Sequence, residues 1–179
     1  MKTPTIRDFT IHGSSGHSVL NSKWLDWIAE HQNKPGCTYD NRYGFGRGTH
    51  FSWYVGDERI ERAVDKWIYV HELPDASGFI GFEKDWKPDN CLLFDAYGKE
   101  RMRLTVPWEL TGRQIPKDAV MTFKNVSAPC INPQDGKVGQ FGVSAYIEGS
   151  GSGGYAEGDW YFELDYHTGK FLWGKEIRS

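Results

Sequence analysis

The sequence has 179 residues and a formal net charge of −3, with 39% hydrophobic and 25% charged residues. This length and composition predict one folded domain, residues 1–179, and exclude a chain that is disordered throughout. The mildly acidic balance argues against sequence-independent nucleic-acid binding, which depends on Lys and Arg at phosphates. No stretch is apolar enough to span a bilayer, and the first residues lack the apolar core of a signal peptide. We therefore expect a cytoplasmic protein without membrane contact.

Aromatic residues and glycines are abundant: the chain contains 10 Phe, 9 Tyr, 8 Trp and 21 Gly. Aromatic side chains suit pleated surfaces, and glycine supplies the positive φ that tight hairpins need. These features predict a β-rich α+β fold. In it, an antiparallel sheet is curled or sandwiched on itself and one N-terminal helix packs on the sheet.

The first predicted element is a helix over Ser22–Gln32. Trp24, Trp27 and Ile28 repeat at helical spacing, and a Pro-Gly pair at 35–36 stops the pattern. The next feature is the glycine-rich run at 42–49, whose alternating glycines can point successive N–H groups at an anion. It lacks the strand-to-helix context of a nucleotide-binding loop, so we interpret it as the glycine-rich approach to a strand.

Residues 57–67 allow two interpretations. Ile60, Val64 and Trp67 have helical spacing, whereas Gly56-Asp57 between two apolar segments fits a hairpin. We favour the helix.

From Ile68 onward the apolar period is two, which predicts strands. With one earlier strand, they are expected at 51–55, 68–72, 79–83, 91–95, 101–106, 120–126, 139–147, 159–165 and 171–177. Turns ending in Gly-Lys at 95–99, 133–137 and 165–170 predict three hairpins, and the Gly/Ser run at 149–154 is expected as a loop tip. The expected core contains Trp24, Ile28, Met102, Leu104, Phe141, Val143, Trp160, Phe162 and Leu164.

The cysteines and histidines form no recognisable site. Cys37, Cys91 and Cys130 are far apart, and the six histidines include no HExxH pattern. We therefore expect reduced structural thiols, no metal, no cofactor and no catalytic residues.

Two segments are rich in carboxylates. Residues 146–165 carry five and no Lys or Arg, and residues 72–89 carry five against two lysines. Such charge is often only solvated, but around exposed aromatics such as Trp86 and Tyr161 it can bind a basic protein surface. The candidate partner-binding residues are therefore Asp85, Trp86, Asp89, Glu157, Asp159 and Asp165. In this interpretation Trp86 fills a pocket of the partner.

Two runs of sequence combine a hydrophobic strand with a tight turn: NCLLFDAYGK, from Asn90 to Lys99, and GDWYFELDYHTGK, from Gly158 to Lys170. They resemble the cytosolic immunity proteins that accompany polymorphic or contact-dependent growth inhibition toxins of bacteria. In that family a hydrophobic strand, a D-x-x-G turn and a late aromatic hairpin ending in Thr-Gly-Lys recur. The resemblance implies an antitoxin that binds and blocks a cognate toxin domain, such as a nuclease with a basic cleft, without catalysis of its own.

Two other functions remain open. Eight Trp residues offer stacking platforms for carbohydrate in a ligand-binding β-domain. Dispersed carboxylates and histidines offer the groups of an enzyme site. Sugar titration and activity screens distinguish these functions from toxin binding.

Overall fold

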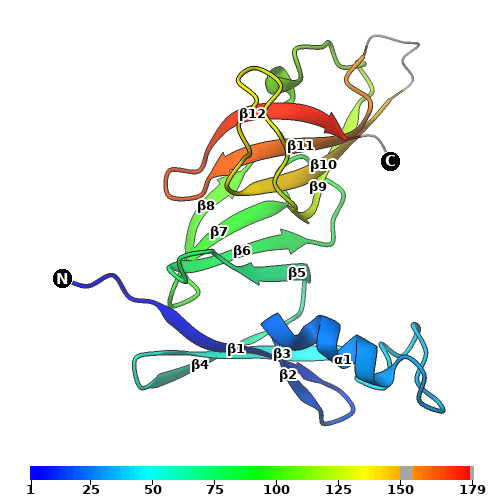
Figure 1. Ribbon diagram of the computed structural model, residues 1–179, viewed down its shortest axis with the longest axis vertical. Helices are drawn as coiled ribbons and strands as arrows, with labels where there is room; N and C mark the ends of the chain where they lie inside the picture. Colours follow the sequence, from blue (N-terminus) through cyan, green and yellow to red (C-terminus); the bar gives the residue numbers. More distant parts are fainter. Residues whose placement is uncertain (150–154, 178–179) are drawn as a thin grey trace. The chain divides into compact units, whose positions relative to one another are not determined.

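The computed structural model describes residues 1–149 and 155–177 (Figure 1). Within these residues, twelve strands form three four-stranded antiparallel sheets. The predicted β-rich fold with an N-terminal helix is confirmed. Most of the Gly/Ser run expected as a loop tip, residues 150–154, lies outside the described residues. None of the helices in the described part of the chain has both the length and the apolar character to cross a membrane.

Each sheet has its own strand order. The first, β2-β1-β3-β4, contains β1 (Ile6–Gly13), β2 (Ser18–Leu20), β3 (Gly48–Val55) and β4 (Glu58–Ala63). The second, β5-β6-β7-β8, contains β5 (Trp67–Glu72), β6 (Gly78–Glu83), β7 (Cys91–Asp95) and β8 (Glu100–Leu104). The third, β12-β11-β10-β9, contains β9 (Val120–Ser127), β10 (Gly142–Glu148), β11 (Gly158–Asp165) and β12 (Lys170–Ile177). A 3-10 turn, η2, spans Trp108–Thr111.

The chain forms two compact units. The first contains Met1–Trp67, His71–Phe79 and Asp95–Lys99; the second contains Ile68–Val70, Ile80–Phe94 and Glu100–Ser179. The β1–β4 sheet belongs to the first unit and the β9–β12 sheet to the second. Organisation as a single domain stays a prediction.

In the first unit, helix α1 (Trp24–His31) follows the 3-10 turn η1 (Asn21–Lys23), in agreement with the predicted helix. Its aromatic side packs on the fully buried Phe45, with ring centroids 5.0 Å away for Trp24 and 5.8 Å for Trp27. No residue of α1 is buried, so the expected burial of Trp24 and Ile28 is wrong. A helix of only two turns that packs along one side leaves its wide side chains half exposed.

The predicted helix at 57–67 is also wrong, because β3 and β4 form a hairpin there. Val55 pairs with Glu58, and the two residues between them close the turn with Gly56 at a φ of 58°. The helical spacing of Ile60, Val64 and Trp67 is coincidental, since only Ile60 of the three is buried. Cross-strand hydrogen bonds therefore outweigh a weak local pattern.

The glycine-rich run is the approach to β3, as interpreted from the sequence, and its N–H groups point inward. Asn41 accepts from Gly44 N–H at 3.0 Å through Oδ1 and from Gly46 N–H at 3.0 Å through its carbonyl oxygen. Ser14 Oγ accepts from Arg47 N–H at 2.9 Å. Asn41 and Ser14 thus occupy these donors, which argues against an anion cradle.

In the second unit, β10 shows the predicted alternation, and the predicted inward positions of β11 are buried. Leu104, Phe141, Val143, Trp160, Phe162 and Leu164 are buried, as expected. Met102 is not: it is 38% exposed and covers Gly169, whose missing side chain leaves it room. Met102 lies on β8, which is the last strand in its sheet and so has no neighbouring strand on one side.

Both faces of β11 are buried, so the expected exposure of Tyr161 is wrong. Tyr161 is fully buried, and its ring occupies the space that a side chain at Gly142 would need. Its hydroxyl donates to Glu163, whose carboxylate also accepts from Gln140 N–H at 2.6 Å and Phe141 N–H at 3.3 Å. Burial raises the pKa of Tyr161. Glu163 is thus a structural acceptor, not a surface charge.

The three predicted turns form. Residues 95–99 join β7 to β8, residues 165–170 join β11 to β12, and the third turn lies between the bridged pair Ile131 and Val138. All three cysteines are free. Burial raises the pKa of the Cys91 thiol, which keeps it protonated and unreactive.

Candidate functional site

The loop between β6 and β7 carries Asp85, Trp86 and Asp89, three of the predicted site residues. Hydrogen bonds between the residues that flank it close its two ends together. Glu83 N–H donates to the Asn90 carbonyl at 2.8 Å, and Asn90 Nδ2 donates to the Glu83 carbonyl at 3.2 Å. The loop therefore has a fixed base.

Ion pairs at the base of the loop also restrain it. The Glu83 carboxylate, with a 5% exposed side chain, accepts from Lys87 at 2.7 Å and from the two terminal nitrogens of Arg103 at 2.9 and 3.3 Å. Arg103 also donates to the Asp89 carbonyl at 2.8 Å. The hydrogen bond that Arg103 donates to the Glu83 carboxylate raises the pKa of Arg103. Two cations on one buried carboxylate fix the path of the loop.

Asn90 connects the loop to β9. Its side chain is 2% exposed, and its amide pairs with both backbone groups of Phe123. Nδ2 donates to the Phe123 carbonyl at 3.0 Å, and Oδ1 accepts from Phe123 N–H at 2.8 Å. The loop is thus fixed to the edge of the β9–β12 sheet.

Trp86 projects from this fixed loop with 61% of its surface exposed. Its ring makes an edge contact with Tyr146 of β10 at a centroid distance of 5.9 Å. Lys124 of β9 places its ammonium 5.8 Å from the Tyr146 ring centroid and 2.9 Å from Asp159 Oδ1. We call Trp86, Tyr146, Lys124 and Asp159 the Trp86 face. Residues from four segments, the β6–β7 loop, β9, β10 and β11, therefore form one continuous surface.

A groove of about 390 Å³ adjoins the Trp86 face. Its exposed apolar residues are Trp86, Ile68 and Tyr69, the last two 50% and 41% exposed on β5. Lys84, Lys124 and Asn125 contribute polar atoms to its walls. Exposed aromatic and aliphatic side chains beside a groove are features of protein-binding sites.

The six predicted site residues do not all lie together. Trp86 and Asp159 share the Trp86 face, and Asp85 and Asp89 flank Trp86 on its loop. Glu157 is half-buried just before β11.

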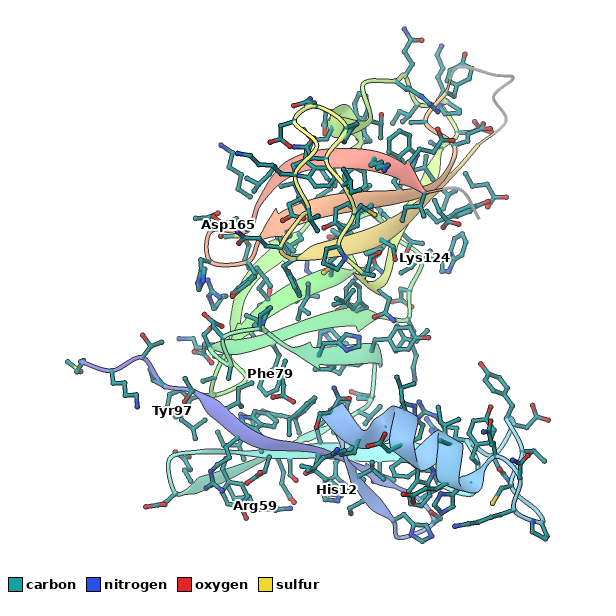
Figure 2. The ribbon with its side chains drawn as sticks, viewed as in Figure 1. His12, Arg59, Phe79, Tyr97, Lys124 and Asp165 are labelled. Atoms are coloured by element: carbon teal, nitrogen blue, oxygen red, sulfur yellow. The ribbon has the colours of Figure 1, made fainter. Side chains whose placement is uncertain are left out.

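Asp165 lies at the other end of β11, about 20 Å along the strand from Asp159. Figure 2 shows Asp165 and Lys124 at opposite ends of their sheet. Asp165 Oδ1 accepts from the backbone N–H of His167 at 3.0 Å and of Thr168 at 3.4 Å. A hydrogen bond from the Thr168 side chain is the main cause of its lowered pKa. This carboxylate stabilises a turn.

Sequence reasoning missed Tyr146, Lys124 and Tyr69. The outward position of Tyr146 on a period-two strand was a usable signal. Lys124 gave none, because a β-bulge near this position shifts the β9–β10 register.

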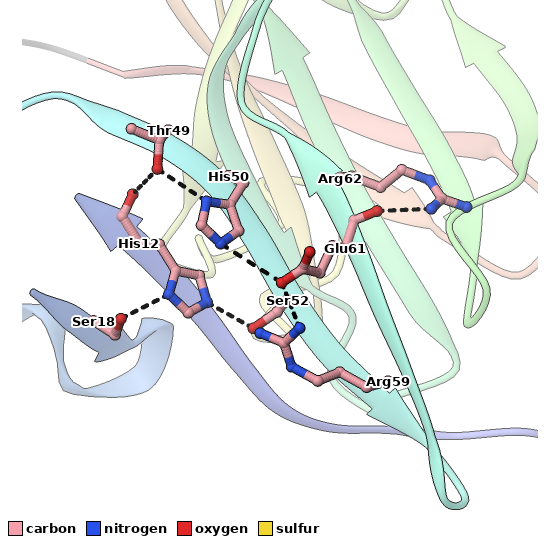
Figure 3. A network of polar contacts seen from close by, with 8 residues as sticks. All are labelled: His12, Ser18, Thr49, His50, Ser52, Arg59, Glu61 and Arg62. Carbon is pink, nitrogen blue, oxygen red and sulfur yellow. Dashed lines mark hydrogen bonds and ion pairs between the residues drawn. The ribbon is translucent and has the colours of Figure 1, made fainter. Parts of the chain in front are cut away.

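A second polar cluster lies in the first unit (Figure 3). His12 and His50 are cross-strand neighbours on β1 and β3, and their rings stack at a centroid distance of 4.1 Å. His12 Nδ1 lies 2.6 Å from Ser18 Oγ, and Nε2 lies 2.7 Å from Ser52 Oγ. Across the described residues, no three His, Cys, Asp or Glu side chains come together as a metal site would require.

Charges around this cluster disfavour protonation of His12. Burial lowers its pKa from 6.5, and the positive charges of His50 and Arg59 lower it further, whereas Glu61 opposes them. Glu61 itself contacts Arg59 and lies 3.7 Å from His50 Nε2. The two rings are therefore most stable when His12 is neutral.

We expect acid to destabilise the protein through His12. The unfolded state binds more protons than the folded state near the unfolded pKa of about 6.5. The stability from neutral His12 is complete above that pH and is lost as pH falls through the lower folded pKa. Urea midpoints at about pH 7.5 and 5.5 should differ more for the wild type than for His12→Gln. His17→Gln, outside the cluster, should keep the wild-type difference; equal differences for all three proteins would contradict this role.

No family model matches the chain, and no curated protein matches it. Among solved structures, it is similar to a chain from the structure of Tne2 in complex with Tni2, with a TM-score of 0.58 and 12% sequence identity. The match covers 97% of this chain and 99% of that chain. At this identity the likeness shows a shared fold, which extends over nearly the whole of both chains.

Proposed function

We propose that this chain is an immunity protein that binds a cognate bacterial toxin domain in the cytoplasm and blocks it without catalysis. The observation that carries this proposal is Trp86, 61% exposed on a loop that Glu83, Arg103 and Asn90 hold in place. Tryptophan is enriched among the residues that dominate binding energy at protein interfaces. A fixed loop loses little conformational entropy when a partner covers it.

Two further observations support a protein partner. The chain of similar fold comes from a complex of two proteins, Tne2 and Tni2. The runs at Asn90–Lys99 and Gly158–Lys170 resemble toxin-associated immunity proteins, which gives the class of partner. The first run begins at the residue that fixes the Trp86 loop to β9.

Truncation of Trp86 is expected to weaken the complex with the toxin domain encoded beside this chain's gene. Trp86→Ala should raise the dissociation constant by about 30-fold, which corresponds to about 2 kcal/mol, because the indole is the central apolar anchor. Tyr39→Ala is the matched control: Tyr39 is 81% exposed in the first unit, outside the Trp86 face. It should leave the dissociation constant within about twofold of the wild type.

Calorimetric titration and survival of cells that co-express the toxin measure this effect. Thermal unfolding of both variants verifies their folding. Absence of a complex with the wild-type protein would refute the proposed function. Equal toxin binding by the Trp86→Ala and Tyr39→Ala variants would show that the Trp86 face does not contribute to binding.

The groove also favours a second candidate function, binding of a small carbohydrate. Its volume of about 390 Å³ lies in the range of small-ligand sites, and Trp86 and Tyr69 offer aromatic faces. Titration with mono- and oligosaccharides, followed by tryptophan fluorescence, tests this function independently of any toxin. Saturable quenching that Trp86→Ala abolishes would support it.

A further inference from the structure

The charges that line the groove differ in sign from those expected of the candidate site. Among the described residues that line it, Lys84 and Lys124 are the exposed charged side chains. Glu83 also lines it, but its side chain is 5% exposed and neutralised by Lys87 and Arg103. Asp85 and Asp89 are not among the lining residues. Ammonium groups are therefore the exposed charged groups of the groove lining, and that of Lys124 pairs with Asp159.

Lys124 is positioned to bind an additional acceptor. Its side chain is 51% exposed, and its ammonium contacts Asp159 at 2.9 Å. An ammonium group has three N–H donors, so one carboxylate does not exhaust it. The Tyr146 ring, with its centroid 5.8 Å from the ammonium, adds a cation–π contact. Lys124 thus offers N–H donors to the same groove that Trp86 and the apolar side chains of β5 line.

From this arrangement we propose that the groove binds an acidic, apolar segment of the partner protein. An aromatic or aliphatic side chain of that segment packs against Trp86, Ile68 and Tyr69. Neighbouring carboxylates accept hydrogen bonds from Lys84 and Lys124. This inference deepens the proposed function, and it reverses the expected polarity: the lysines, not Asp85 and Asp89, make the main charged contacts.

Charge-swapped variants test the polarity with the adjacent toxin domain. Lys84→Glu combined with Lys124→Glu should weaken the complex by about 100-fold at low salt and by less at high salt, because surface charge pairs are screened. Asp85→Lys combined with Asp89→Lys is the matched control and should change affinity less than about threefold. Lys84→Gln with Lys124→Met removes the charges while the Met side chain stays beside Tyr146. It should weaken binding by about tenfold with unchanged thermal unfolding. A large loss in the Asp variant alone would overturn the inference and leave the proposed function standing.

A peptide probe tests the groove without the toxin. The wild-type chain, labelled with ¹⁵N, is titrated with acetyl-Gly-Asp-Phe-Asp-Gly-amide and with its Lys-for-Asp analogue. The acidic peptide should shift the Trp86 indole and the Lys124 amide resonances at millimolar concentration, and the basic peptide should not. Shifts from the basic peptide, or from neither, would overturn the inference. Shifts from the acidic peptide in a protein that binds no toxin would support the groove while refuting the immunity function.

Discussion

Asn90→Ala is expected to lower the free energy of unfolding by about 3–5 kcal/mol. The substitution removes a side-chain partner from three backbone groups, the Phe123 N–H, the Phe123 carbonyl and the Glu83 carbonyl. Because the Asn90 side chain is 2% exposed, water does not replace these bonds without rearrangement. Denaturant unfolding monitored by tryptophan fluorescence measures the change.

Two variants make the test specific. Asn125→Ala deletes the same atoms from a half-buried position on β9 and should cost less than about 1 kcal/mol. Asn90→Asp keeps the shape and the acceptor for Phe123 N–H but places a carboxylate oxygen opposite two carbonyl oxygens, so it should be nearly as damaging as alanine. A cost below about 1 kcal/mol for Asn90→Ala would show that Asn90 does not fix the loop to β9.

Arg103→Met is expected to cost about 3–4 kcal/mol, more than Glu83→Gln. The reason is an asymmetry in exposure: the Glu83 side chain is 5% exposed, whereas those of Lys87 and Arg103 are 37% and 31% exposed. Loss of Arg103 leaves a buried carboxylate with one cation. Glu83→Gln instead leaves Lys87 and Arg103 without the carboxylate, but both side chains are exposed enough to be solvated.

A double variant separates buried charge from packing. Glu83→Leu with Arg103→Met should recover most of the loss, because apolar side chains then replace both charges. Urea unfolding of the single and double variants gives the coupling free energy between Glu83 and Arg103. Additive losses in the double variant would contradict this account.

The strands and turns were largely predictable because their signals are local. Val143 and Phe162 occupy inward positions of period-two patterns, and Asp165 starts a recognisable turn. The hairpin at β3–β4 was not, because the choice between helix and strand there depends on pairing across Gly56. The predicted exposure of Tyr161 was wrong for a related reason. Alternation identifies one buried face of a strand but cannot show that the other face is buried too.

The candidate site was predictable only in part. Trp86 was identifiable because a large aromatic stands among charges in a short segment between strands. Its neighbours Lys124 and Tyr146 come from other strands and meet it through strand pairing and the Asn90–Phe123 contact. Counting charges along the sequence also overstated the acidic surface, because Glu163 is buried and the Asp165 carboxylate accepts hydrogen bonds from its own turn.

The packing of Tyr161 against Gly142 has a consequence for how distant relatives of this chain can vary. A Cβ at Gly142 would collide with the Tyr161 ring, and one at Gly139 would meet both Glu163 and the Tyr161 hydroxyl. A side chain at position 139 or 142 is therefore compatible only with a change at 161 or 163. We expect homologues with a small residue at 161 to tolerate a side chain at 142, and those with tyrosine at 161 to keep both glycines. This joint substitution pattern would identify relatives whose remaining residues have diverged beyond recognition.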